Sequence, residues 1–566
     1  MATELPWLAS YPSAARWDVS FPPERVDRLL DETVERFPDR PCVEFLGKRY
    51  SYREIGDYVA RAAAGLQARG VTKGTRVGLF MPNCPYSVIA YYAILKTGGI
   101  VVSFNPLYAE AELRHQIRDS GVEIMMTLDL AALHGPLLKM LDGSTPLKTV
   151  VCCSMADALP FPKNRLFGLL RRRERAAVPN DGRHVAFATL TENDGKVAPV
   201  EIDPLRDVAV LQYTGGTTGT PKGAMLTHDN LSVNARQCRA WFPTLAPGGE
   251  RVVAVLPFFH VFGMSVVMNF GVAIGAELIL LPRFELKQLL ETINARKPTV
   301  FAGVPTIFNA INTHADASRY DLSSIKRCFS GGAPLPVEVK AKFERNTGCI
   351  LVEGYGLTET APVVTSNPPE GLNKPGSIGV PFPGTVIEIV ALDGSDRVLP
   401  PGERGEVCVR GPQVMAGYWR KPEETAKVLR NGRLHTGDVG YMDEDGYVFL
   451  VDRIKDVILC SGYNVYPRQV EEAIYQHPSV AECLVVGMPD AYRGQTVKAY
   501  IVRRAGMALD QQELIAFLKD KLSAIEMPKI VEFRETLPKT AIGKLSRKAL
   551  LDEAAAAMEP QQQTQA

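Results

Sequence analysis

A glycine- and threonine-rich segment with one lysine is the part of this chain whose residue types most clearly predict chemistry. It spans residues 213–224 and directly follows the apolar run 208–211, an order that predicts a strand leading into a phosphate-binding loop. Its glycines let the backbone approach an anion, while its threonine hydroxyls and its ammonium group can donate hydrogen bonds to phosphate oxygens. The residues of this loop are Tyr213, Thr214, Gly215, Gly216, Thr217, Thr218, Gly219, Thr220, Pro221, Lys222, Gly223 and Ala224.

The loop differs from the Walker A motif of many nucleotide-binding proteins. In that motif a lysine directly follows the last glycine, whereas here Thr220 and Pro221 separate Gly219 from Lys222. Clusters of glycine, threonine and proline are usually surface turns. A long run of this composition directly after a predicted strand favours an anion site over a simple turn.

Five further segments place polar or charged side chains at turns. Taken singly, each has an ordinary explanation: a lone histidine is usually a core residue, and a terminal lysine is usually solvated. Their order along the chain favours one shared site. The segments are Phe258-Phe-His-Val-Phe-Gly263, Ser330-Gly-Gly-Ala-Pro334, Gly354-Tyr-Gly-Leu-Thr-Glu359, His435-Thr-Gly-Asp438 and Pro538-Lys-Thr-Ala-Ile-Gly-Lys544.

The elements that must position these side chains read as an α/β fold. Short apolar runs alternate with amphipathic stretches, as at 76–81, 84–97 and 100–103, which predicts βαβ units and mainly parallel sheets. Residues 385–450 instead predict short antiparallel strands between glycine, proline and aspartate turns. We therefore expect a large N-terminal body over 1–451, made of α/β subdomains and a β subdomain.

A charged junction at 452–456 separates this body from a second unit. Residues 457–551 predict a small α+β domain at the C-terminal end. The remaining tail, 552–566, is rich in alanine and glutamine with no core-forming pattern, so we expect it to be disordered.

Composition excludes several classes of function. The 566 residues have a formal net charge of +1, so no overall field favours binding to nucleic acid. The ten cysteines form no CxxC pair, which indicates neither a metal framework nor a disulfide scaffold and fits a cytoplasmic protein. No basic and apolar leader stands at the start, so we expect no signal peptide. The apolar stretch 264–281 is interrupted by polar residues and glycines, and predicts a buried helix and strand rather than a membrane span.

One short segment, 163–175, stands out in charge. Its basic residues surround several leucines and one phenylalanine, which is typical of a short helix lying on an anionic membrane surface. A solvated loop whose few apolar residues dock on the body explains the same pattern. Both interpretations stay open from the sequence, and the first would place the protein at the inner face of the cell membrane.

Together the motifs resemble the adenylate-forming superfamily of acyl-CoA synthetases, adenylation domains and firefly-type luciferases. The resemblance covers about residues 25–551, and the nearest likeness is to bacterial long-chain fatty acyl-CoA synthetases. The segments that support it best are Leu211-Gln-Tyr-Thr-Gly-Gly-Thr-Thr-Gly219, Glu353-Gly-Tyr-Gly-Leu-Thr-Glu-Thr360 and Ser461-Gly-Tyr-Asn-Val-Tyr-Pro467.

This resemblance implies a two-step reaction with ATP, Mg²⁺ and coenzyme A. A fatty acid carboxylate attacks the α-phosphate of ATP to give an acyl-adenylate and pyrophosphate, and the thiol of coenzyme A then displaces AMP. Residues 213–224 would hold the β- and γ-phosphates, Thr358 would contact phosphate, and Glu359 would bind Mg²⁺. Asp438 and Arg453 would hold the ribose. The residues implied on the adenine side are Gly332, Ala333, Pro334, Tyr355 and Gly356.

The resemblance also implies which residues act in each step. Lys544 would be the catalytic lysine of adenylation, bridging the carboxylate and the α-phosphate, and His260 would orient the carboxylate beside an acyl tunnel. Rotation of the C-terminal domain about Lys455, in the hinge 452–456, would withdraw Lys544 for the thiol step. It would present Ser461, Gly462 and Tyr463 on the coenzyme A side. A homodimer is compatible with this family.

One position departs from the family pattern. Some long-chain members have a tryptophan gate four residues past the histidine, and this chain has Met264 there. Ligases for medium-chain or aryl acids remain an alternative, while amino acid adenylation is disfavoured because 259–262 lacks an aspartate. A catalytically silent nucleotide-binding or membrane-associated protein predicts damage to the charged motif residues. All of those residues are present: Lys222, Glu359, Asp438, Arg453 and Lys544.

Overall fold

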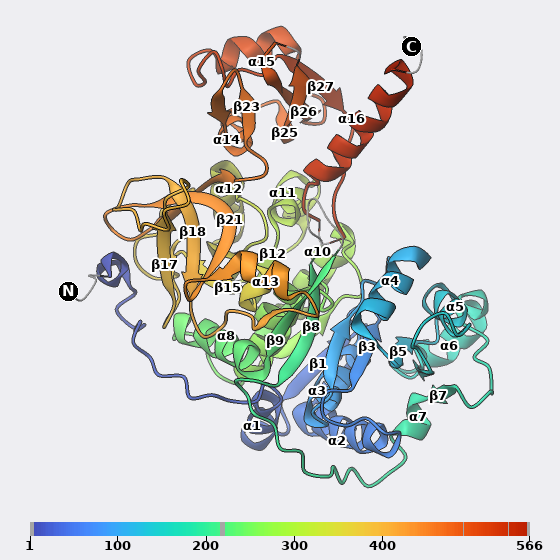
Figure 1. The fold of residues 1–566 in the computed structure, drawn as a ribbon. Coiled ribbons are helices and arrows are strands. Elements are labelled where there is room, and N and C mark those ends of the chain that lie inside the picture. Colours follow the sequence, from blue (N-terminus) through green and yellow to red (C-terminus); the bar gives the residue numbers. More distant parts are fainter. Residues whose placement is uncertain (1–4, 215–220, 491, 542, 563–566) are drawn as a thin grey trace.

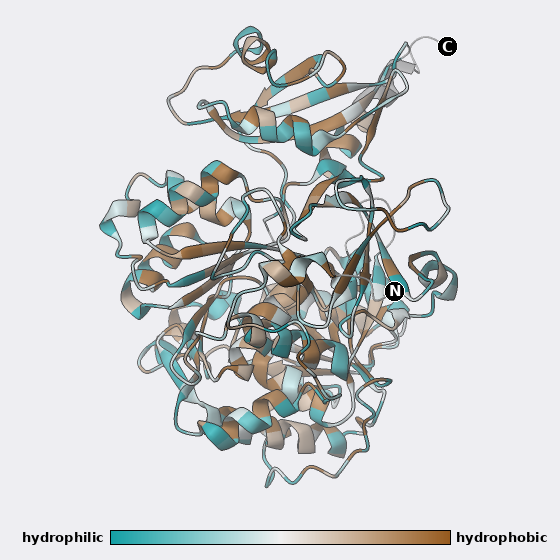
Figure 2. Ribbon diagram, turned by 90° about the vertical axis from the view of Figure 1, so that its left-hand side faces the viewer, coloured by the Kyte–Doolittle hydropathy of each residue, from teal (hydrophilic) through white to brown (hydrophobic). Residues whose placement is uncertain are grey.

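Four β-sheets flanked by helices build the protein, and the C-terminal domain sits above a much larger body (Figure 1). The computed structural model describes residues 5–214, 221–490, 492–541 and 543–562. The predicted α/β class with a separate β unit is confirmed. In Figure 2 the apolar residues concentrate on the strands inside the body, and the outer helices are mixed or hydrophilic.

The first sheet has nine strands, and its central members run parallel because helices connect them. In spatial order its strands are β16 (Val380–Pro381), β15 (Val363–Ser366), β14 (Ile350–Gly356), β13 (Arg327–Ser330), β12 (Val300–Gly303), β10 (Arg251–Ala254), β11 (Glu277–Leu280), β1 (Pro41–Phe45) and β2 (Lys48–Ser51).

The second sheet has eight strands, parallel except at the edge that ends in β19, β9 and β8. Its strands in order are β19 (Gly417–Tyr418), β9 (Lys222–Thr227), β8 (Val208–Thr214), β4 (Ile100–Ser103), β3 (Arg76–Phe80), β5 (Ile124–Leu128), β6 (Thr149–Cys153) and β7 (His184–Ala186). The expected strand, helix and strand at 76–103 correspond to β3, α3 (Pro85–Lys96) and β4.

The third sheet is antiparallel, as the turn-rich stretch 385–450 predicts. It contains β17 (Val386–Val390), β18 (Gly405–Arg410), β20 (Leu429–Arg430), β21 (Arg433–Met442) and β22 (Val448–Arg453). The fourth sheet forms the C-terminal domain from β23 (Ile458–Cys460), β24 (Tyr463–Val465), β25 (Val480–Asp490), β26 (Gly494–Arg503) and β27 (Ile530–Arg534).

Helices cover these sheets on their outer faces (Figure 1). The longer helices besides α3 are α1 (Arg28–Arg36), α2 (Tyr52–Ala68), α4 (Glu110–Ser120), α5 (Ala131–Met140), α6 (Lys163–Leu170), α8 (His228–Trp241), α10 (Leu286–Arg296), α11 (Pro305–Thr313), α12 (Val337–Thr347), α14 (Pro467–Tyr475), α15 (Gln511–Leu518) and α16 (Arg547–Gln562). The shorter ones are α7 (Phe187–Leu190), α9 (Phe270–Ala273) and α13 (Pro422–Val428).

Separate hydrophobic cores fill the two parts of the chain. One cluster of buried apolar side chains runs from Trp7 to Val448, and two smaller clusters lie between Ile458 and Leu550. The break between them falls at the charged junction 452–456. Because each part has its own hydrophobic core, the C-terminal domain could move without disrupting the core of the body. The movement itself stays a prediction.

The expectation of a disordered tail is wrong for most of its length. Helix α16 continues to Gln562, because its alanines have the highest intrinsic helix propensity and because Leu550 and Ala554 pack it onto a hydrophobic cluster of the C-terminal domain. The apolar stretch 264–281 is buried as expected, as a π-helix (η3, Gly263–Asn269), α9 and β11. Among the described helices, none combines the length and apolarity required to cross a membrane.

Candidate active site

A cavity of about 2200 Å³ opens between the body and the C-terminal domain. It lies at the C-terminal ends of β8, β13 and β14, where parallel sheets commonly bind ligands. Most of the sequence-predicted residues line it: Tyr213, Thr214, Lys222, His260, Gly332, Ala333, Pro334, Tyr355, Gly356, Thr358, Glu359, Asp438, Arg453, Lys455 and Lys544. Residues 215–220 of the predicted phosphate loop lie outside the described residues.

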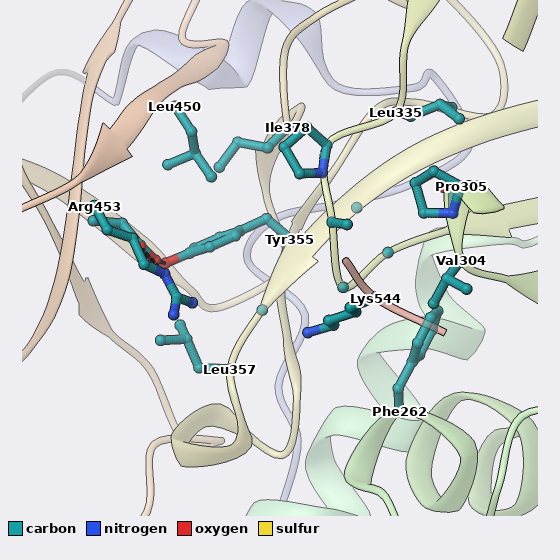
Figure 3. A pocket seen from close by; sticks show the side chains of 18 of the residues that line it. Phe262, Val304, Pro305, Leu335, Tyr355, Leu357, Ile378, Leu450, Arg453 and Lys544 are labelled. Carbon is teal, nitrogen blue, oxygen red and sulfur yellow. Dashed lines mark hydrogen bonds and ion pairs between the residues drawn. The ribbon is translucent and has the colours of Figure 1, made fainter. Parts of the chain in front are cut away.

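Lys544 reaches this cavity from the C-terminal domain. Its loop is closed by a hydrogen bond from the Thr540 amide to the Lys544 carbonyl (2.7 Å), and the Thr306 hydroxyl of α11 donates to the Gly543 carbonyl (2.8 Å). In Figure 3 the lysine lies between Tyr355 and Val304. Helix α11 is thus the point where the body holds the C-terminal loop.

The ammonium of Lys544 occupies an unfavourable place for a lone cation. Its pKa is lowered to about 8, mainly because the group is removed from water and also because the Arg453 guanidinium repels it, while the Asp438 carboxylate partly opposes both effects. A second positive group close to a buried ammonium means that the site is short of negative charge. Binding of an anion between these groups would supply it.

Asp438 anchors the opposite wall of the cavity. Its carboxylate accepts hydrogen bonds from the Tyr355 hydroxyl and from Arg453 Nε (3.0 Å). Figure 3 shows Tyr355 pointing toward Arg453 across the cavity. These groups come from β14, β21 and β22, so three separate strands must be in register to assemble them.

His260 is held as a neutral donor. The amide of Phe262 donates to His260 Nδ1 (3.2 Å), which leaves the proton of the neutral ring on Nε2. Burial lowers its pKa to about 3, and the charge of Lys544 contributes. The supporting loop is fixed by Gln212, whose Nε2 donates to the Phe259 carbonyl (2.8 Å). A neutral Nε2–H group suits a hydrogen bond to a carboxylate oxygen.

Lys222 and Glu359 meet at a tyrosine that the sequence analysis did not single out. The Tyr418 hydroxyl donates to Glu359 Oε1 (2.7 Å), and Lys222 Nζ lies 4.5 Å from the Tyr418 ring centroid. Lys222 also pairs with Glu424 Oε2 at 2.9 Å. Tyr418 lies on β19, which pairs antiparallel with β9, almost two hundred residues earlier in the chain. No local sequence pattern predicts a pairing between strands so far apart.

Several predicted residues lie away from the cavity. Ser461, Gly462 and Tyr463 form the exposed turn between β23 and β24, and Tyr463 is 64% exposed. Gly223 and Ala224 are within β9 and do not line the cavity. Met264 is buried and does not line it either, because the wider turns of the π-helix present Phe262 and Val266 to the cavity instead.

Two family models match the chain. The model described as AMP-binding enzyme covers residues 30–419, and the AMP-binding enzyme C-terminal domain covers 469–544. The chain belongs to the AMP-binding enzyme family. A long-chain-fatty-acid–CoA ligase of Bacillus subtilis (strain 168) is 46% identical to this AMP-binding enzyme over 557 residues, covering 98% of this chain and 99% of the relative.

Solved structures agree with this assignment. An anthranilate CoA ligase, AuaEII, in complex with anthranoyl-AMP, superposes with a TM-score of 0.84 at 26% identity, covering 95% of this chain and 99% of that one. ATP-bound MatB of Rhodopseudomonas palustris has a TM-score of 0.81 at 28% identity, covering 94% and 99%. The fold of this AMP-binding enzyme is therefore that of the adenylate-forming enzymes.

The contact between Gly332 and Lys544 generates a test of docking. A Cβ atom at Gly332, whose φ is +82°, would stand 2.6 Å from Lys544 Cε. We expect Gly332→Ala to push the Lys544 side chain aside and loosen its loop, so that amide hydrogen exchange at residues 540, 541 and 543–545 accelerates by a few-fold. Gly348→Ala is the matched control, because its φ is +70° and no atom lies within 4 Å of its Cβ position. Equal exchange in the two variants would contradict the docking.

Proposed function

We propose that this enzyme is an ATP-dependent long-chain fatty acid–CoA ligase that forms an acyl-adenylate and then an acyl-CoA. The observation that supports this most directly is the meeting of Lys544, His260 and Asp438 in one cavity that also has an apolar arm. The relative of 46% identity bears the name of the same activity and matches along nearly its whole length.

In the first half-reaction, Lys544 would bind between the fatty acid carboxylate and the α-phosphate. Its ammonium offsets the negative charge that develops during the transfer, in a site already short of negative charge. The neutral Nε2–H of His260 would donate to the carboxylate and hold it for attack in line. Positioning two bound reactants in this way accounts for up to roughly 7–11 kcal/mol of barrier reduction in favourable cases.

The nucleotide would lie along the wall that carries Asp438. Its carboxylate would accept hydrogen bonds from ribose hydroxyls, exchanging its present partner Tyr355 for the substrate, and Lys222 would leave Glu424 for the phosphates. Glu359 would offer a carboxylate oxygen beside this path, and oxygen ligands are what Mg²⁺ prefers, so the residue fits the ion, while Thr358 would contact phosphate. When bound, Mg²⁺ neutralises charge on the phosphates.

An apolar arm of the cavity supports a long acyl chain as the substrate. It runs between α8 and the first sheet, and the side chains that line it are Cys238, Phe242, Val266, Phe270, Phe329, Ile378 and Phe382. Phe242 and Phe329 pack edge to face with ring centroids 4.5 Å apart, and Phe270 lies 6.1 Å from Phe329. A medium-chain or aryl acid would leave much of this surface uncovered.

The second half-reaction would require the C-terminal domain to turn. In the present arrangement Lys544 fills the site, whereas Ser461, Gly462 and Tyr463 face away from it. Rotation at 452–456, with Lys455 as the hinge residue, would remove the lysine and let the thiol of coenzyme A approach the adenylate. The separate hydrophobic cores on either side of this junction support such movement.

The test of the proposed activity is an assay of both half-reactions over a series of acids. We expect exchange of labelled pyrophosphate into ATP that depends on palmitate, and thioester formation whose kcat/KM rises about fourfold per added methylene until the apolar arm is filled. Benzoate and octanoate serve as comparison acids. A preference for either would favour the alternative ligases, and no exchange with any carboxylic acid would contradict the proposal.

We further propose that helix α6 lies on an anionic membrane surface during catalysis. None of its residues is buried, and Leu169 and Leu170 are 78% and 76% exposed, so they do not dock on the body. Exposed arginines follow directly at 171–173. Helix α6 is at the edge of the molecule (Figure 1), and long-chain acids partition into membranes, so this contact would place the enzyme near its substrate.

Neutralising exposed charge next to α6 tests this contact. Arg172→Gln with Arg173→Gln should weaken binding to vesicles containing phosphatidylglycerol by about fivefold per charge, because each arginine near an anionic surface contributes about 1 kcal/mol. The control removes two exposed charges elsewhere, with Arg283→Gln and Lys287→Gln. Unchanged sedimentation with such vesicles, or equal loss in the control, would favour a solvated segment.

A further inference from the structure

Behind Asp438 the β18–β21 ladder contains an irregularity that points its carboxylate into the cavity. Cys408 pairs with His435 and Glu406 pairs with Val439, so three residues of β21 stand opposite the single residue Val407. Such a bulge bends its strand and re-aims a side chain. Asp438 is one of the three bulged residues.

Glu406 occupies the inside of this bulge. Its Oε1 accepts a hydrogen bond from the Gly437 amide (2.9 Å), and its Oε2 accepts one from His435 Nδ1 (2.7 Å). Gly437 has a φ of +74°, a conformation that residues other than glycine rarely adopt, and the glutamate is the side chain that holds its amide. Glu406 is only 8% exposed, which limits competition from water for these bonds.

The backbone on either side of Gly437 is fixed as well. The Thr436 hydroxyl donates to the Val407 carbonyl (2.7 Å) and accepts from the Asp438 amide (3.1 Å). The Ile454 amide donates to the Gly437 carbonyl (2.9 Å). Glu406 therefore belongs to a network that includes backbone groups, the Thr436 hydroxyl, His435 and Arg430, whose Nη2 lies 3.8 Å from Glu406 Oε2. This network ends directly at Asp438.

A metal centre is the other use for these groups, since ligand atoms of Glu406, Cys408 and His435 lie within 4.8 Å of one another. Arg430 Nη2 is 3.1 Å from His435 Nδ1, and a bound cation would meet that guanidinium. Burial raises the pKa of the Cys408 thiol, which opposes the thiolate that a metal requires. The Arg430 guanidinium and the protonated Cys408 thiol therefore favour hydrogen bonding among Glu406, Cys408 and His435 over metal binding by them.

We propose that Glu406 is a positioning residue that holds the bulge so that Asp438 meets the ribose hydroxyls of the nucleotide. The proposal rests on the proposed function, because it takes Asp438 as the ribose ligand. In this role Glu406 does not bind the substrate itself. It acts through its hydrogen bonds to the Gly437 amide and to His435 Nδ1.

Two conservative variants separate positioning from general support of the fold. Glu406→Gln keeps an oxygen that can accept from Gly437, whereas Glu406→Asp is one methylene too short to reach it. The measurement is the ratio of kcat/KM for ATP to kcat/KM for 2′-deoxy-ATP and 3′-deoxy-ATP in acyl-adenylate formation. In the unaltered enzyme we expect at least one ratio of about tenfold or more, because the deoxy analogue leaves the carboxylate unpaired.

We expect Glu406→Asp to bring that ratio close to the value of Asp438→Ala, while Glu406→Gln stays within about threefold of the unaltered enzyme. In the double variant Glu406→Asp/Asp438→Ala, the change at Glu406 should have no further effect on the ratio. Glu388→Ala is the matched control: this carboxylate lies in the same sheet and pairs with Arg410 (3.1 Å) and Arg433 (3.2 Å). Its ratio should be unchanged.

Other outcomes would overturn the inference. If Glu406→Asp slows ATP and its deoxy analogues equally, Glu406 only supports the fold. Stoichiometric zinc in the purified protein that disappears in Cys408→Ser would show a metal centre instead. Failure of the proposed function is distinguishable, because the unaltered enzyme would then form no acyl-adenylate with any of the nucleotides.

Discussion

The shortage of negative charge around Lys544 is the constraint on which the rest of the site depends. Burial and the nearby Arg453 guanidinium lower the pKa of Lys544, and the Asp438 carboxylate, which pairs with Arg453 at 3.0 Å, only partly opposes this. A site of this kind binds an anion strongly and is costly to keep closed without one. On the proposed function, a negatively charged nucleotide would therefore favour the closed position of the C-terminal domain over the body.

The surrounding structure serves this arrangement. Helix α11 receives the lysine loop through Thr306, and Gly332 leaves room for the lysine stem. Strands of three separate sheets end at the cavity and contribute its polar groups, among them Thr214 from β8, Tyr355 from β14, and Asp438 and Arg453 from β21 and β22. On the proposed function, a single cavity would bring a charged nucleotide and an apolar chain together at one carboxylate, and Lys544 would have to leave it before coenzyme A approaches.

Much of this could be predicted from the sequence, because the motif residues follow strands whose alternation with helices is regular. The end of β14 presents Tyr355, and β13 leads into Gly332, as the positions of their motifs after predicted strands indicated.

Residues whose partners lie far away in the chain could not be predicted from the sequence. Tyr418 and Glu406 have no local signature, since their partners are set by strand pairing and by a bulge. Met264 stands where some family members have a tryptophan gate, and the structure shows it buried in the π-helix without lining the cavity. The tail after residue 551 lacks a core-forming pattern, yet it continues as helix to Gln562 from a turn that Leu550 and Ala554 pack onto the C-terminal domain.

The central claim is that Lys544 serves the first half-reaction and must leave before the second. The most direct measurement compares Lys544→Ala with the unaltered enzyme in two separate assays: acyl-adenylate formation from ATP and palmitate, and thioester formation from supplied palmitoyl-adenylate and coenzyme A. The account predicts a loss of about 100- to 1000-fold in the first assay, since a charged group aimed at the developing charge is removed, and a nearly unchanged rate in the second. Equal losses in both assays would contradict it.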